Sequence, residues 1–360
     1  MPLAIGGVSV EFPHEPYPCQ LLYMQRVIEA LSGFKNALLE SPTGTGKTMS
    51  LLCSSLAWQL ENNLKCKGPR IKLGYNSEPS SSLAPNVHTK PTFIIYASRT
   101  HAQLQQVVVE LKKTSYSPRY VVLGSRDQLC IQDSLRSKRY RGPVLDLACS
   151  GLCAQHKCRY KNNIEGKRIE HITLPAMMDI EEAVTFGRRS ETCSYFTTRE
   201  AAKSADLVLM PYNYLLDGFL RGSMNLEWNR AIVIFDEAHN LEEAASTAAS
   251  FTLSSHDLTS SLKDLLRVLE ILTGGNVSAS SSSSFVFSAG TASLPSTADI
   301  RYLIQVVERL ESRLGGIPLQ ADTATGMYCG DMEGMFLIDV FISCGISIDK
   351  VGRRDMLKYE

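Results

Sequence analysis

The sequence predicts an α/β fold in which helices cover a mostly parallel β-sheet. Five short apolar runs rich in branched residues are typical of buried strands. Segments with a helical spacing of apolar residues lie between these runs, and this alternation favours a parallel sheet with helices on both faces. The five expected strands are residues 36–40, 92–97, 119–124, 205–210 and 231–236.

Two stretches interrupt this alternation. Residues 125–204 hold five of the ten cysteines and no run typical of a strand, so we expect them to form a domain inserted between two core strands. Further along, helical spacing predicts helices at 256–272 and 300–314. The glycine- and serine-rich tract between these helices, and residues 66–91, are expected to form exposed loops.

The composition excludes several classes of protein. Lysine plus arginine equals aspartate plus glutamate at 37 each, so a nucleic-acid surface would have to be a local patch. The N-terminus lacks the features of a signal peptide, and the apolar segment from Met335 is broken by Asp339. We therefore expect a soluble intracellular protein with no membrane segment, in which cysteines serve as thiols or metal ligands rather than disulfides.

The segment SPTGTGKT, residues 41–48, has the pattern of a phosphate-binding loop, although serine occupies its first glycine position. Its two glycines allow backbone amides to turn toward phosphate oxygens, its lysine reaches the outer phosphates and its last threonine can hold magnesium. A chance glycine turn before a helix is the alternative. The expected ATP-binding residues here are Ser41, Gly44, Thr45, Gly46, Lys47 and Thr48.

The segment AIVIFDEAHN, residues 231–240, supplies carboxylates at the end of an expected strand. Asp236 would hold magnesium through water, and Glu237 would orient and deprotonate the attacking water. His239 is expected to link the state of the phosphate to a second surface. The alternative is an ordinary acidic helix start capped by Asp236. The strand before it and the phosphate loop elsewhere in the chain favour the catalytic interpretation.

Four segments together resemble the iron-sulfur DNA helicases of superfamily 2, the xeroderma pigmentosum group D and DinG-like family. They are SPTGTGKT, YASRTHAQLQQ (96–106), MPYNYLLD (210–217) and DEAH, in that order. The resemblance implies a RecA-like motor domain that couples ATP hydrolysis, with Mg²⁺, to 5′ to 3′ unwinding of DNA. It also implies single-stranded or forked DNA as the partner, a nuclear location, and roles in DNA repair and telomere maintenance.

The resemblance also assigns roles to residues outside the two nucleotide motifs. Gln20 would read the adenine, although a glutamine at a helix start is usually only a solvated side chain. Residues 98–101 would grip DNA phosphates beyond a strand end, and a helix cap is the alternative there. The implied DNA-binding residues are Ser98, Arg99, Thr100 and His101.

In this family, four cysteines of an insert bind a [4Fe-4S] cluster. The resemblance places these ligands at Cys130, Cys149, Cys158 and Cys193, with 18, 8 and 34 residues between them. That spacing alone is no ferredoxin signature. Cys153 is surplus and could replace Cys149, four thiolates would also suit zinc, and five buried free cysteines are a third possibility. Because an insert without strands has little core, a metal could hold it folded.

The same insert is locally basic. Between Cys130 and Glu170 there are nine lysines and arginines against four acidic residues, with Tyr140 and Tyr160 interleaved. This mixture suits a groove that follows a phosphate backbone and stacks bases. A solvated basic face is the alternative interpretation.

The resemblance also predicts the domain organisation. Residues 1–124 and 205–250 would form the first motor domain, 125–204 the iron-sulfur insert, and 251–360 part of a helical arch domain. No QxxGRxxR segment of a second motor domain occurs. We therefore expect an ATP-binding half of a helicase that is weakly active or inactive alone. A non-catalytic DNA-binding or regulatory fragment and a DEAH-type RNA helicase are the alternatives.

Overall fold

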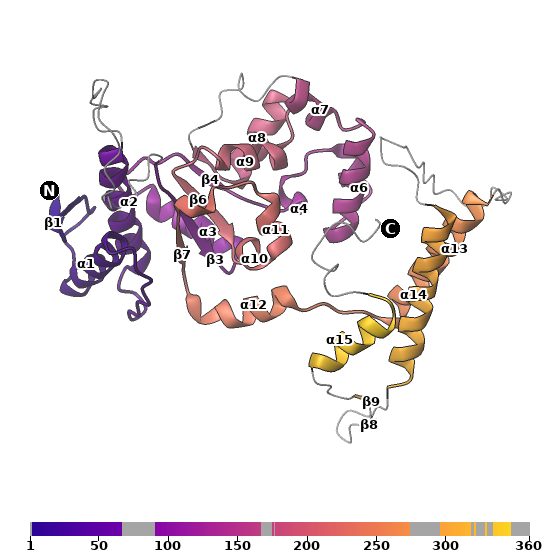
Figure 1. Cartoon of the computed structure of the whole chain (residues 1–360). Coiled ribbons are helices and arrows are strands. Elements are labelled where there is room, and N and C mark those ends of the chain that lie inside the picture. The colour runs from indigo at the N-terminus through magenta and orange to yellow at the C-terminus, as the bar shows by residue number, and fades with distance from the viewer. Residues whose placement is uncertain are drawn as a thin grey trace, which may run out of the picture. The chain divides into compact units, whose positions relative to one another are not determined.

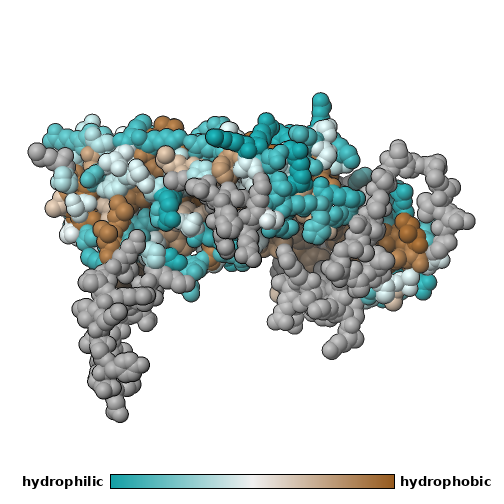
Figure 2. All heavy atoms as spheres, turned by 90° about the horizontal axis from the view of Figure 1, so that it is seen from above, coloured by the Kyte–Doolittle hydropathy of each residue, from teal (hydrophilic) through white to brown (hydrophobic). Residues whose placement is uncertain are grey.

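The computed structural model describes residues 2–66, 91–166, 175, 177–273, 296–317, 320–321, 328–329 and 334–346. The chain divides into two compact units, Met1–Ser250 and Phe251–Glu360 (Figure 1). The expected loops at 66–91 and 274–285 lie almost wholly outside the described residues. On the face shown in Figure 2, hydrophilic residues alternate with smaller hydrophobic areas.

A five-stranded sheet forms the centre of the first unit, in the order β5-β4-β6-β3-β7. Every neighbouring pair of strands is parallel, which confirms the predicted α/β fold with a parallel sheet. Four of the five predicted strands are present. The strands are β3 (Phe93–Ser98), β4 (Tyr120–Val122), β5 (Met177–Met178), β6 (Leu207–Pro211) and β7 (Ala231–Phe235).

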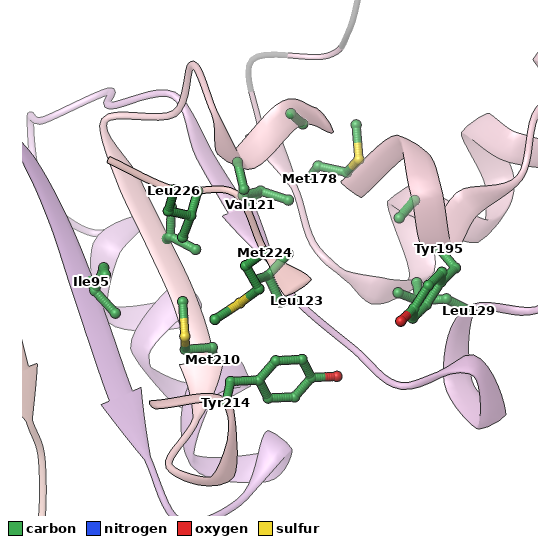
Figure 3. Close-up of a cluster of buried hydrophobic side chains, with 14 of the residues drawn as sticks. Ile95, Val121, Leu123, Leu129, Met178, Tyr195, Met210, Tyr214, Met224 and Leu226 are labelled. Carbon is green, nitrogen blue, oxygen red and sulfur yellow. The ribbon is translucent and has the colours of Figure 1, made fainter. Parts of the chain in front are cut away.

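Each face of the sheet is buried against a different set of helices, because successive side chains of a strand point to opposite faces. Ile94 and Tyr96 of β3 pack against α2 (Lys47–Cys66) and α3 (His101–Leu111). Ile95 of the same strand belongs to a second cluster, with Met210, Met224 and residues of the insert (Figure 3). Burial on both faces explains why β3, β4 and β6 are continuous apolar runs rather than alternating ones.

The prediction of a fifth strand at residues 36–40 is wrong. These residues adopt no strand in the structure, and the Leu38 side chain is 93% exposed. Among the described strands, β7 pairs only with β3, so its other edge is open, and residues 36–40 do not pair with it. Three short strands were not predicted: β5, and the hairpin of β1 (Leu3–Ile5) and β2 (Val8–Val10). Their two or three residues are too few to show a period.

The hairpin packs with α1 (Pro18–Ser32) and α2 into a third cluster beside the sheet. The insert between β4 and β6 is mainly helical, apart from the short β5. Its helices are α4 (Arg126–Leu129), α5 (Asp133–Arg136), α6 (Gly142–Ala154), α7 (Arg159–Gly166), α8 (Ile180–Ser190) and α9 (Ser194–Ala202). The unit ends with α10 (Asn213–Leu216), α11 (Gly218–Ser223), η2 (Trp228–Arg230), η3 (Ala238–Asn240) and α12 (Leu241–Ala249).

The second unit confirms both predicted helices, α13 (Ser255–Leu272) and α14 (Thr297–Gly315). Ser254 and Ser296 begin them with capping boxes, which satisfy free amides of the first turn. A small cluster joins these helices to α15 (Gly334–Ser343), and β8 (Gln320–Ala321) pairs with β9 (Tyr328–Cys329). No helix in the described part of the chain is long and apolar enough to cross a membrane.

Truncating Leu123 tests the core between the sheet and the insert. This side chain is 0% exposed and directly follows β4. We expect Leu123→Ala to lower the free energy of unfolding by about 2–5 kcal/mol, because it leaves a cavity in a packed core. Urea unfolding followed by circular dichroism measures this change. Val144→Ala is the matched control, since Val144 is 57% exposed, and an equal loss in both variants would contradict the expectation.

Candidate nucleotide-binding and cysteine sites

The phosphate loop has the conformation that its glycines predict. Gly44 and Gly46 have φ angles of 79° and 71°, in the left-handed region that favours glycine. A Cβ at Gly46 would also lie only 2.6 Å from the side-chain nitrogen Nε2 of Gln20, so a larger residue would clash there. The loop leads directly into α2, which begins at Lys47. Its free backbone amides therefore stand at the positive end of a twenty-residue helix.

The Gln20 side chain hydrogen-bonds to the backbone of the phosphate loop. Its side chain is only 4% exposed, and its Nε2 donates to the Thr45 carbonyl at 2.9 Å. Its Oε1 accepts from the Tyr17 amide at 2.9 Å. One end of this side-chain amide therefore binds the loop, and the other end caps α1. Ser41 takes part as well, because its hydroxyl lies 2.7 Å from that of Thr45.

The acidic strand end lies beside this loop. Lys47 Nζ is 3.7 Å from Glu237 Oε1, although the two residues are far apart in the sequence. The Asp236 amide donates to the Ala97 carbonyl at 2.9 Å, and the Tyr212 hydroxyl donates to the Asp236 carbonyl. Glu237 has a φ of 54°, an uncommon value for a residue with a side chain. The backbone turn after β7 therefore directs its carboxylate toward the lysine.

Burial dominates the electrostatics of Asp236. It raises the pKa of this carboxyl, the charge of Glu237 adds to the rise, and Lys47 opposes it. Burial likewise raises the pKa of Tyr96 well above its usual value. The Tyr96 hydroxyl interacts with Asp236 and Thr48. A carboxylate, a threonine hydroxyl and this hydroxyl form an oxygen-rich set that fits Mg²⁺ and its water.

A chain of polar contacts leads away from the acidic strand end. His239 lies 3.3 Å from Glu237 through Nδ1 and 2.9 Å from Asn240 through Nε2. Asn240 accepts from Arg99 Nη1 at 2.8 Å. Arg99 also forms an ion pair of 3.1 Å with Glu243 of α12. Lys47, Glu237, His239, Asn240 and Arg99 are thus connected by successive contacts.

Arg99 lies on the wall of a groove of about 850 Å³ near the carboxyl ends of β3 and β6. His101 also lines it, and burial lowers the pKa of that histidine. The other two predicted DNA-binding residues are engaged elsewhere. Ser98 is buried and donates to Gln103, and Thr100 caps α3, as the helix-cap alternative predicted. Further lining residues include Ser125, Gln128, Tyr212, Asn213, Tyr214 and Asp217.

Five cysteines from distant parts of the insert line one small cavity. Most of them lie at helix ends. Cys130 follows α4, Cys158 precedes α7 and Cys193 precedes α9, whereas Cys149 and Cys153 lie in α6. Only Cys153 of the five is not fully buried. The cavity-lining cysteines are Cys130, Cys149, Cys153, Cys158 and Cys193.

These thiols differ in their readiness to ionise. A hydrogen bond with Cys153 lowers the pKa of Cys158 to about 6, helped by the amides of Lys161 and Tyr160. The pKa of Cys149 falls to about 7, through Cys153 first and then Arg126. Burial raises the pKa of Cys193 to about 12. A bound cation would reverse that last effect, because metal ligation deprotonates thiols.

The cavity offers thiol ligands for a metal group. Four thiolates can hold an iron-sulfur cluster, or a single zinc ion at about 2.3 Å from each sulfur. The sulfurs of Cys149 and Cys153 are 4.0 Å apart. Within the described residues, no group of three or more His, Cys, Asp or Glu side chains is arranged to hold one metal ion.

Some of the basic residues of the insert interact with other residues of the insert, so they are less available to bind DNA than the sequence implies. Arg159 lies over the ring of Tyr160 and Lys161 over the ring of Phe196, at 4.7 and 4.3 Å from the ring centroids. Arg159 pairs with Glu191, and Lys161 pairs with Glu165. Part of the predicted basic patch therefore stabilises the insert itself. Lys167 and Arg168, which were counted in that patch, lie outside the described residues.

Residues 96–258 match a family model described as DEAD_2. The chain is 37% identical to Regulator of telomere elongation helicase 1 of Bos taurus, over 97% of this chain and 30% of that protein. It is 42% identical to the Oryza sativa subsp. japonica homolog, over 74% of this chain and 28% of that protein. These matches confirm the helicase resemblance indicated by the motifs.

The chain spans about 30% of the length of these relatives, and the same holds for the Homo sapiens protein at 35% identity. Among solved structures, one titled XPD_Helicase aligns with 94% of this chain and 48% of its own. The sequence identity there is 15% and the TM-score is 0.44. A second, titled Truncated XPD, covers 89% of this chain and 74% of its own, with a TM-score of 0.40.

Several residues that position the nucleotide site were missed in the sequence. Tyr96 and Tyr212 look like ordinary core residues there, because only the fold brings their hydroxyls to Asp236. Asn240 directly follows the acidic motif, so its position in the sequence could have indicated a role in the site. The sequence gives no such indication for Glu243, because its ion pair with Arg99 joins segments far apart in the chain.

Proposed function

We propose that this chain is the ATP-binding half of an ATP-dependent DNA helicase, which couples ATP hydrolysis to DNA unwinding in the nucleus. The contact of 3.7 Å between Lys47 and Glu237 carries this proposal, because it brings the phosphate loop and the acidic strand end to one place. The DEAD_2 match and the telomere elongation helicases among the relatives support it. Roles in telomere maintenance and DNA repair belong to the same proposal.

The residues divide the chemistry between them. The loop amides and Lys47 would bind the phosphates. Thr48 and Asp236 would hold Mg²⁺, which would neutralise charge on the transferring phosphate. Glu237 accepts a proton from the attacking water. Without nucleotide, Lys47 is paired with Glu237. A bound phosphate would draw Lys47 away and leave the Glu237 carboxylate free to act as a base.

The groove beside Arg99 and His101 is the proposed path for single-stranded DNA. An arginine and a partly exposed histidine at its wall can contact phosphates, and Tyr212 and Tyr214 line it as well. The proposed cluster ligands are Cys130, Cys149, Cys158 and Cys193, which hold the insert that borders this path. The cluster is proposed to stabilise the fold rather than to transfer electrons.

An ATPase assay with defined nucleic acids tests the proposal. Single-stranded DNA should raise the rate of phosphate release more than RNA of the same sequence does. We expect slow turnover by this chain, because no QxxGRxxR segment supplies the arginines of a second motor domain. Tight ATP binding with no effect of either nucleic acid would contradict coupling. Stronger stimulation by RNA would favour an RNA helicase instead.

Removing Glu243 tests the groove. In the structure this carboxylate competes with phosphate for Arg99, so Glu243→Ala should tighten binding of single-stranded DNA. Both side chains are largely exposed, which limits the gain to about 0.2–1 kcal/mol, or roughly 1.4- to 5-fold in Kd. Fluorescence anisotropy at fixed salt measures it. Glu242→Ala is the control, because it removes the same charge from the neighbouring exposed position, and equal tightening in both variants would contradict this role of Arg99.

A further inference from the structure

The cysteine cavity has one thiol more than a four-cysteine cluster uses. Cys149 and Cys153 both line it, and they lie one turn apart on α6. Their sulfur atoms are 4.0 Å apart. The cavity therefore holds a close pair of thiols of which at most one is needed as a ligand.

The geometry of this pair permits a disulfide. Residues four apart on a helix rise by about 6 Å, and disulfides span Cα separations of about 4.4–6.8 Å. The two sulfurs must approach from 4.0 Å to about 2.05 Å, which requires side-chain rotation and a small backbone adjustment. Cys153 is next to the last residue of α6, where a helix end adjusts at low cost. It is also the one half-exposed cysteine of the five, so a small oxidant reaches it first.

We propose that Cys149 and Cys153 form a reversible disulfide when the cavity holds no metal and hydrogen peroxide is present. The Cys153 sulfur attacks one peroxide oxygen, which breaks the O–O bond, leaves a sulfenic acid on Cys153 and releases one water. The Cys149 sulfur then attacks the oxidised sulfur and displaces the second water. The two thiols lose two electrons and two protons in total, and the peroxide is reduced to water.

This disulfide would control loading of the cavity. It withdraws Cys149, so three thiols remain where the proposed cluster needs four. It also protects both sulfurs from irreversible oxidation until a dithiol reductant reopens the pair. The inference rests on the proposed function only through the assignment of Cys149 as a ligand. The disulfide itself depends on the geometry of α6.

Peptide mapping of the full chain tests the disulfide. The protein is freed of metal with a chelator under reducing conditions, desalted, exposed briefly to hydrogen peroxide, alkylated and digested with trypsin. Cleavage after Arg141 and Lys157 gives a peptide, residues 142–157, that contains Cys149 and Cys153 and no other cysteine. We expect it to be lighter by two hydrogens and to carry no alkyl group. Alkylation of both cysteines, or cross-links to Cys130, Cys158 or Cys193, would overturn the proposal.

Two variants complete the experiment. In Cys153→Ser, Cys149 should stay open to alkylation after peroxide, whereas Cys19→Ser should behave as wild type, because Cys19 is an exposed residue of α1. Peroxide-treated wild type should take up iron and sulfide only after dithiothreitol, and Cys153→Ser should not need it. Equal uptake by wild type before and after dithiothreitol would overturn the control of loading. Uptake of zinc instead of iron would contradict the proposed cluster, and the peptide map would still decide the disulfide.

Discussion

Lys47→Ala is expected to weaken binding of ATP with Mg²⁺ by roughly one to two orders of magnitude. Lysine Nζ makes charge-assisted contacts with phosphate oxygens, and each such contact contributes about 1.5–3 kcal/mol. The loss should be large, because the lysine starts α2 and lies beside the acidic strand end rather than in open solvent. Titration with a fluorescent ATP analogue measures the change in Kd.

A matched control lies on the same helix. Lys65 is in the last turn of α2, exposed and paired with Glu61 at 2.8 Å, so Lys65→Ala removes an equal charge far from the loop. Its effect on ATP affinity should be within about twofold, since exposed ion pairs contribute little. Glu237→Gln should keep nucleotide affinity and lose hydrolysis, because it removes the base and leaves Lys47 in place. Equal affinities of Lys47→Ala and Lys65→Ala would contradict the proposed site.

The part of this fold that could be predicted from sequence is the part with a strong local pattern. Three of the four confirmed strands, β3, β4 and β6, are apolar runs buried on both faces, and α13 and α14 have clear helical spacing and serine caps. Residues 36–40 show the limit of such reasoning. Their composition is typical of a strand, but they pair with no described strand, although one edge of β7 is open. Pairing is a property of the fold, not of the segment.

The candidate site likewise combines residues that local sequence patterns predict with contacts that only the fold creates. The motifs predicted that Lys47, Asp236 and Glu237 would share one site. The structure places Lys47 Nζ 3.7 Å from Glu237 Oε1, although the strand expected before the phosphate loop does not form. The resemblance gives Gln20 a role in reading adenine, and the structure adds contacts that fix the phosphate loop. The surplus Cys153 illustrates a further limit. Spacing ranked it below Cys149 as a ligand, but only the folded insert shows that both thiols line one cavity.

Cys158→Ser is expected to lower bound iron from about four atoms per chain to less than about one. Hydrogen bonds from a thiol and two backbone amides lower the pKa of Cys158. They favour the thiolate form, which metal ligation requires. Iron content and the visible absorption of anaerobically purified protein measure the loss. The melting temperature should fall as well, because the insert around Cys130 and Cys149 has only a small apolar core.

The same measurement identifies the second ligand. If Cys149 is a ligand, Cys149→Ser should lose iron as Cys158→Ser does, while Cys153→Ser and Cys19→Ser should keep it. The reverse result would make Cys153 the ligand, and its higher pKa, raised by hydrogen bonds with Cys149 and Cys158, argues against that outcome. Stoichiometric zinc without iron in the wild type would contradict the cluster altogether.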